Sequence, residues 1–180
     1  VTVRSYAARA LAKQRDPRVL GLLARAAGDA DFRVRIAAVR ALGAFGDSAA
    51  LPQVLGALAD REPAVRETAA TAAGQLHSRD AAPALRKALG DADPAVRLAG
   101  ARALAALLGD GAWPDLRGLL ADPERFVRAG VVAALGGMQG EEPRLVLQKV
   151  AAGLKPVGGN ATVEERSSAF SGLAQAKARS

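Results

Sequence analysis

Residues 29–43 read DADFRVRIAAVRALG, and most of this skeleton occurs three more times. The related stretches are ADREPAVRETAATAAG (59–74), GDADPAVRLAGARALA (90–105) and ADPERFVRAGVVAALG (121–136). A Val-Arg dipeptide recurs every 31 residues, with its arginines at Arg4, Arg35, Arg66, Arg97 and Arg128. An aspartate column keeps the same step, six residues before the arginine, at Asp29, Asp60, Asp91 and Asp122. Five arginines in register indicate internal repeats.

Each repeat is predicted to be a pair of helices. The first helix carries an apolar stripe of helical period, as in Val34, Ala38, Ala41 and Leu42. Asp31 and Asp93 are predicted N-caps. Prolines are expected in the first helical turn, at Pro63, Pro94 and Pro123. A shorter second helix follows, with a proline near its start at Pro52, Pro83 and Pro114.

The composition favours an all-α fold. Half of the 180 residues are hydrophobic but only 3% are aromatic, so small aliphatic side chains must form the core. The absence of cysteine excludes disulfides and thiolate metal sites, and no apolar stretch is long enough to span a membrane. The cellular location stays open, with the cytoplasm favoured. Because the pattern begins in mid-repeat at Val1, further repeats or a cap are expected before it.

This pattern resembles the HEAT repeat: Asp, then six residues later Val-Arg, then Ala-Ala-x-x-Ala-Leu-Gly, a turn, and Leu-Pro-x-Leu-x-x-Ala-Leu. It is similar to the short bacterial HEAT-like class first recognised in phycobilin lyases. The resemblance implies an α-solenoid (an α-α superhelix, armadillo-like), with first helices on the convex side and second helices lining a concave surface. We expect five repeats within residues 1–152, at 1–28, 29–59, 60–90, 91–121 and 122–152.

The C-terminal part departs from the period. Residues 153–163 read as a loop insertion, and residues 164–180 as one more first helix that caps the stack. The helix carries polar residues expected to form a solvated end: Glu164, Glu165, Ser167, Ser168, Ser171 and Gln175.

The repeated charges are interpreted as structural. Each column arginine except Arg4 has an acidic residue four positions before it, a favourable helix pairing, and an aspartate six positions before it. The HEAT resemblance implies that the aspartates and arginines form a ladder that ties neighbouring repeats together. The predicted ladder residues are Asp29, Asp60, Asp91, Asp122, Arg35, Arg66, Arg97 and Arg128.

The remaining basic residues are the candidate binding site. The net charge is +7, and the second helices hold two adjacent basic columns made of Arg25, Arg86, Lys87, Arg117 and Lys149. We expect them to form a basic stripe along the concave groove, although an ordinary solvated face would show the same pattern. Trp113, the only tryptophan, either packs between repeats or anchors a ligand. A second basic set, Arg9, Arg40 and Arg102, lies on the first helices.

The sequence gives catalysis little support. His77 is the only histidine, so a metal site is not expected, and no cofactor is expected either. The glycine-rich run 136–140 follows a helix and lacks a Gly-Lys-Ser/Thr ending, which favours a helix end over a phosphate loop. We therefore expect a non-catalytic scaffold that binds an acidic segment of a partner protein. The alternatives are binding of nucleic acid or another polyanion, and a bilin or tetrapyrrole lyase-like enzyme.

Overall fold

The structure is a computed structural model that describes residues 2–11, 18–154 and 161–178. Within these ranges the regular elements are α-helices and short 3₁₀ helices, so the fold is all-α, as predicted. The chain divides into two compact units, Val1–Ala103 and Leu104–Ser180. No helix in the described ranges is both long and apolar enough to cross a bilayer.

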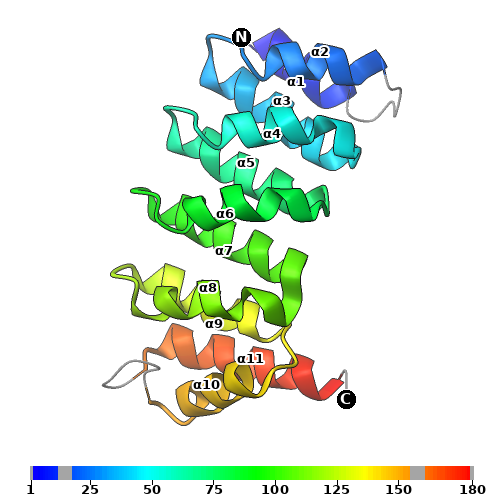
Figure 1. Ribbon diagram of the computed structural model, residues 1–180. Coiled ribbons are helices and arrows are strands. Elements are labelled where there is room, and N and C mark those ends of the chain that lie inside the picture. The colour runs from blue at the N-terminus through cyan, green and yellow to red at the C-terminus, as the bar shows by residue number, and fades with distance from the viewer. Residues whose placement is uncertain (1, 12–17, 155–160, 179–180) are drawn as a thin grey trace. The chain divides into compact units, whose positions relative to one another are not determined.

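The first unit alternates long and short helices (Figure 1). The long helices are α1 (Thr2–Leu11), α3 (Phe32–Phe45), α5 (Pro63–Gln75) and α7 (Pro94–Leu108), the last of which continues into the second unit. The short helices are α2 (Arg18–Ala26), α4 (Leu51–Ala57) and α6 (Ala82–Ala88), of which the last two follow the 3₁₀ turns η1 (Ser48–Ala50) and η2 (Arg79–Ala81). Helix α3 packs against both α1 and α5. Successive long helices are therefore direct neighbours.

The second unit holds the remaining helices. They are η3 (Gly109–Ala112), α8 (Trp113–Leu116), η4 (Arg117–Ala121), α9 (Arg125–Leu135), α10 (Glu141–Ala151) and α11 (Val163–Ala178). Helix α11 packs against both α9 and α10. The division of the sequence into five 31-residue repeats stays a prediction, and residues 155–160 of the expected insertion lie outside the described residues.

The helix ends follow from local chemistry. The Asp31 carboxylate accepts a hydrogen bond from the Arg33 N–H at 2.9 Å, and the Asp93 carboxylate accepts one from the Ala95 N–H at 2.8 Å. Both residues cap the helices that follow them, as predicted. Prolines begin α5 and α7 and occupy the second position of α4, α6 and α8, where a missing N–H leaves no helical bond unmade. Pro123 is the exception, because α9 begins only at Arg125.

The core consists of aliphatic side chains that recur at equivalent positions of successive long helices. The valine that precedes the column arginine is buried at Val34, Val65, Val96 and Val127, whereas Val3, before Arg4, is exposed. Small residues fill the next turns and let the long helices approach closely. A Cβ atom placed on Gly43 of α3 would lie 2.8 Å from the Ala72 Cα of α5. Because small side chains let the helices pack closely, few aromatic residues are needed to fill the core.

Candidate functional site

The aspartate and arginine columns meet at the turns before successive long helices. The Arg35 guanidinium donates from Nε and Nη2 to the two Asp60 carboxylate oxygens, both at 2.7 Å. Arg66 makes the same fork on Asp91, at 2.8 and 2.7 Å. In both pairs the carboxylate lies 25 residues after the arginine, in the turn before the next long helix. Each fork therefore joins one helix pair to the next.

The remaining arginine nitrogen is bound as well. Arg35 Nη1 donates to the carbonyl oxygens of Asp29 and Ala30, at 3.0 and 3.2 Å. Arg97 makes the matching contacts with the carbonyls of Asp91 and Ala92, at 2.9 and 3.2 Å. The guanidinium thus also closes the turn that precedes its own helix. Four of the five N–H donors of Arg35 are thus bound inside the protein, which argues against a ligand at this position.

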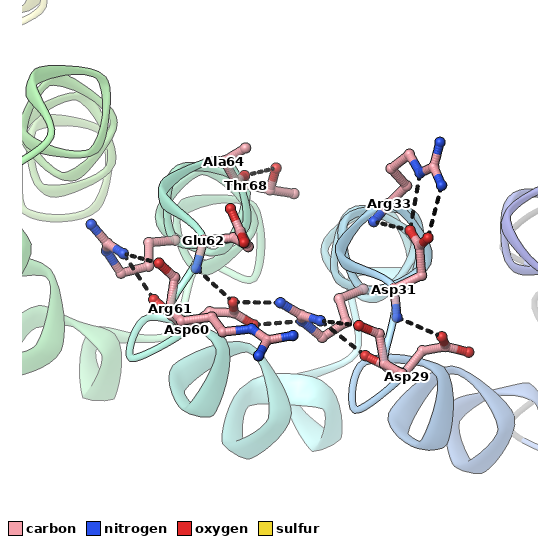
Figure 2. A network of polar contacts seen from close by, with 11 residues as sticks. Asp29, Asp31, Arg33, Asp60, Arg61, Glu62, Ala64 and Thr68 are labelled. Atoms are coloured by element: carbon pink, nitrogen blue, oxygen red, sulfur yellow. Dashed lines mark hydrogen bonds and ion pairs between the residues drawn. The ribbon is translucent and has the colours of Figure 1, made fainter. Parts of the chain in front are cut away.

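Ladder aspartates also accept a hydrogen bond from a backbone N–H of their own turn. Figure 2 shows Asp29 and Asp60 in two successive turns, with dashed contacts to neighbouring backbone and guanidinium groups. The Asp29 carboxylate accepts from the Asp31 N–H, and the Asp60 carboxylate from the Glu62 N–H, both at 2.9 Å. The buried Asp122 accepts from the Glu124 N–H at the same distance. An aspartate therefore fits this position better than a longer glutamate.

The electrostatics match the geometry. The Arg35 guanidinium holds the pKa of the Asp60 carboxyl below its usual value, and the Glu62 N–H adds to this, against burial, which raises it. Arg66 lowers the pKa of Asp91 in the same way. The side chains of Arg35 and Asp60 are only 8% and 12% exposed, whereas Arg4, paired with Asp29 at 2.9 Å, is 56% exposed. We propose that the predicted ladder residues are structural.

The acid four positions before Arg35 has another role than the predicted local pairing. Asp31 pairs with Arg33, whose Nη2 lies 2.8 Å from Asp31 Oδ2. The Arg33 side chain of this pair is 62% exposed. The Arg33 side chain and N–H hold the pKa of Asp31 well below its usual value.

Glu165 is the ladder residue that sequence reasoning missed. It was expected in a solvated cap, but its side chain is 1% exposed and accepts from Arg128 Nε at 2.7 Å. Its other oxygen accepts from the Thr162 N–H at 2.8 Å, while the Glu165 N–H donates to the Thr162 hydroxyl at 3.2 Å. These reciprocal bonds form a capping box at the start of α11. The Thr-Val-Glu-Glu sequence at 162–165 was the signal for it.

Glu165 is charged despite its burial. Desolvation opposes ionisation, but the Thr162 N–H and the Arg128 guanidinium outweigh it, so the pKa lies below its usual value. Arg128 Nη1 also donates to the carbonyls of Asp122 and Pro123, at 2.7 and 3.1 Å. In place of a fork onto an aspartate in the turn, Arg128 thus makes a single Nε bond to a glutamate on the helix.

The five predicted basic residues are all exposed. In the first unit, Arg25 lies in the last turn of α2, and Arg86 and Lys87 lie in the last turn of α6. The matching positions of α4 hold Leu55 and Gly56, so the basic columns are interrupted there. In the second unit, Arg117 begins η4 and Lys149 lies in the last turn of α10. Their role in binding stays a prediction.

Apolar hollows lie beside two of these positions. In the second unit a hollow of about 430 Å³ has Met138, Leu147 and Leu173 on its apolar side, with Arg144 and Lys177 among its polar lining. Gln148, which precedes Lys149, also lines it. In the first unit Arg25 lines a hollow of about 310 Å³ together with Leu22, Leu23 and Leu11.

Trp113 is half-buried at the start of α8, and its indole N–H donates to the Glu142 carboxylate near the start of α10. This contact bridges two helix pairs. It ties the indole to the neighbouring pair and supports the packing interpretation over an open anchor.

The family model for HEAT repeats matches residues 1–62 and 51–136. The chain belongs to the HEAT repeat family. A search of curated protein sequences found no match.

Solved structures agree on the fold. The complex of CpcE and CpcF of phycocyanin lyase from Nostoc sp. PCC7120 is similar over 99% of this chain and 86% of that chain, with 22% identity and a TM-score of 0.52. Human deoxyhypusine hydroxylase is similar over 98% of this chain and 80% of that one, with 20% identity and a TM-score of 0.50. A designed armadillo repeat protein is similar over 96% and 92%, with 18% identity and a TM-score of 0.54. The HEAT chain is thus an α-solenoid.

The other motifs have plain structural places in this HEAT chain. His77 is exposed and follows α5 with a positive φ of 51°, the left-handed conformation common after a helix end. Gly136 follows the last residue of α9, so the glycine-rich run lies at a helix end. Among the described residues, no group of three or more histidine, aspartate or glutamate side chains is arranged to hold a metal ion.

Proposed function

We propose that this chain is a non-catalytic protein-interaction module that binds an acidic segment of a partner protein on its second helices. The proposal uses Arg25, Arg86 and Lys87 in the first unit, and Arg117 and Lys149 in the second. The HEAT fold supports a role in protein interaction, because such repeats commonly serve as interaction scaffolds.

The main support for the proposal is the hollow beside α10. Arg144 and Lys177 bring positive charge to an apolar floor that contains Met138 and Leu147. Such a site fits one apolar side chain flanked by carboxylates, since the floor buries the former and the rim pairs with the latter. Phosphate chains of nucleic acid offer charge but no aliphatic anchor.

Peptide display against the full chain tests this proposal. We expect enriched peptides to carry two or more acidic residues around one apolar residue. The variant Arg144→Glu/Lys149→Glu reverses one charge that lines the hollow and one predicted basic residue beside it. It should weaken the best synthetic peptide at least ~10-fold, which corresponds to about 1.4 kcal/mol. A matched control, Arg40→Glu/Arg102→Glu, reverses exposed charges on the long helices α3 and α7 and should bind within about twofold of the parent.

Two outcomes would contradict the proposal. One is equal loss of binding in both variants, which would indicate a general charge effect. The other is tighter binding to oligonucleotides than to any peptide, with affinity falling by orders of magnitude between ~50 and ~200 mM salt. The second outcome would favour the polyanion alternative.

A further inference from the structure

One repeated position of the short helices changes its charge within the first unit. Arg25 of α2, Gly56 of α4 and Lys87 of α6 are 31 residues apart, so they occupy the same position of successive short helices. The side chains of Arg25 and Lys87 are exposed. A Cβ atom added at Gly56 would have no neighbour within 4 Å, so the space above it is open. Two exposed cations therefore lie on either side of a position without a side chain.

The short helices form a row with α4 in the middle. Helix α2 packs against α1 and α3, α4 packs against α3 and α5, and α6 packs against α5. Figure 1 shows α2, α4 and α6 in this order along the first unit. Because packed helices lie about 8–10 Å apart, one step along the row is about 10 Å. Arg25 and Lys87 are two steps apart, and their separation is therefore roughly 20 Å.

The middle helix of this row carries no charge. Of α2, α4 and α6, only α4 has no charged residue, and none of the three contains an aspartate or a glutamate. The exposed Pro52 and Gln53 of α4 are uncharged. Asp60, in the turn after α4, is bound to Arg35 of the ladder. Along the row, the short helices are therefore positive, neutral and positive.

This charge pattern fits a polypeptide better than a chain of phosphates. A nucleic acid strand has a phosphate at every nucleotide, so several phosphates would lie over α4 with no cation to pair with them. A polypeptide can instead place acidic residues over α2 and α6 and leave the stretch between them uncharged. Like charges spaced in this way would pair with the two cations and avoid the neutral helix.

The floor of the row favours an extended occupant. Gly21 of α2, like Gly56 of α4, has no atom within 4 Å of an added Cβ, and a missing side chain lets another backbone approach closely. The backbone of a helix is surrounded by its own side chains and cannot use this space. An extended chain rises about 3.3 Å per residue, so roughly 20 Å corresponds to about six residues, whereas a helix would need about 13.

We propose that the first unit binds an extended polypeptide segment with two acidic residues about six positions apart, joined by an uncharged stretch that crosses α4. Arg25 receives one acid and Lys87 the other. The inference rests on the proposed function, because it takes the occupant of the short helices to be an acidic protein segment. It adds the spacing of the acids and the neutral character of the residues between them.

A tethered peptide series tests the spacing on the full chain. The chain has no cysteine, so Gln53→Cys places a single thiol on the exposed side of α4. Each peptide has one central cysteine and two glutamates that are 3, 6, 9 or 13 positions apart, and thiol–disulfide exchange measures how readily it forms a disulfide with the chain. We expect the six-position peptide to exceed the other spacings by at least ~2-fold and an uncharged peptide by at least ~4-fold.

Variants in the same background identify the contacts. Arg25→Ala/Lys87→Ala should remove the preference for six positions, whereas Arg40→Ala/Arg102→Ala, which removes two exposed charges from long helices, should keep it. A third glutamate beside the central cysteine should change the exchange constant of the parent by less than ~1.5-fold. It should raise that of Gly56→Lys by at least ~2-fold, because this variant supplies a cation at the neutral position.

Three results would overturn the inference. If all peptides with two glutamates exceed the uncharged peptide equally, the spacing claim fails while an acidic partner remains supported. An optimum at 13 positions would indicate a helical occupant. If acidic peptides are no better than the uncharged one, the proposed function fails in this unit together with the inference.

Discussion

At the scale of single residues, the forks between arginine and aspartate separate into buried and exposed pairs. Arg35 and Arg33 lie two residues apart in α3, and both bind an aspartate. Of these two pairs, only Arg35–Asp60 has both side chains largely buried. Desolvation makes the loss of one partner costly, because the other charge stays buried without compensation.

We therefore expect Arg35→Ala to lower the free energy of unfolding by about 3 kcal/mol. Arg33→Ala is the matched control, and it should change the stability little because its pair is exposed and screened. Urea titrations followed by circular dichroism measure both. Equal effects of the two variants would contradict a structural role for the buried fork.

The lowered pKa values of the ladder carboxyls predict that the chain loses stability in acid. Asp60 and Asp91 have folded-state pKa values below the usual value. A group of this kind contributes stability above its unfolded pKa of about 3.9, and loses it as the pH falls through the folded pKa. The free energy of unfolding should thus be level between about pH 7 and 5.5 and fall below about pH 5.

Asp60→Asn should be less stable than the parent at neutral pH, and its stability should fall less steeply in acid because one of the titrating groups is gone. Urea titrations at a series of pH values give this comparison. Parallel curves for the variant and the parent would show that Asp60 does not carry the acid sensitivity.

At the scale of the helix, glycine decides how closely the long helices pack. A glycine inside a helix normally costs about 1 kcal/mol relative to alanine. Gly43 lies against α5, where an added Cβ would meet Ala72 Cβ at 2.7 Å, whereas Gly56 of α4 has no atom within 4 Å of that place. The same substitution should therefore have opposite signs at these two sites.

We expect Gly43→Ala to destabilise the chain by about 1–3 kcal/mol, because backbone must move to admit the methyl group. Gly56→Ala should stabilise it by about 0.5–1 kcal/mol. Thermal unfolding of both variants tests the prediction. Stabilisation by Gly43→Ala would show that the long helices are not in close contact there.

The capping box of α11 gives a second test at this scale. Thr162→Ala removes one cap and should cost about 1 kcal/mol. Glu165→Ala removes the cap and also leaves Arg128 without its carboxylate, so it should cost at least twice as much. Unfolding in urea compares the two variants. Equal losses would mean that the Arg128–Glu165 ion pair adds nothing to the cap.

The element scale also shows what the sequence could predict. The caps at Asp31 and Asp93, and in the first unit the alternation of long and short helices, follow from local pattern and appear in the structure. The pairing of Arg35 with Asp60, 25 residues later, did not follow from local pattern, where a nearer acid was available; the HEAT resemblance implied it. Glu165 was missed because the insertion breaks the register there.

At the scale of the whole molecule, stability in a repeat protein is a sum of units and of the contacts between neighbours. The hollow of the second unit belongs to this scale, since its lining comes from the turn after α9, from α10 and from α11. No single stretch of sequence carries that juxtaposition, so neither the hollow nor its basic lining residues Arg144 and Lys177 were predicted.

Trp113 offers a probe of the second unit, because it is the only tryptophan. Asp60→Ala weakens a contact in the first unit, so its urea midpoint by circular dichroism should shift more than its midpoint by Trp113 fluorescence. In the parent the two midpoints should be closer together. Identical shifts by both probes would indicate that the chain unfolds as one block.

A double-mutant cycle on Arg66 and Asp91 tests most directly whether forks join successive helix pairs. Urea unfolding of the parent, Arg66→Ala, Asp91→Ala and the double variant should give a coupling free energy of about 1.5–3 kcal/mol, with the double variant little worse than either single one. Additive losses within about 0.5 kcal/mol would contradict the account, because they would show that the two side chains stabilise the chain independently.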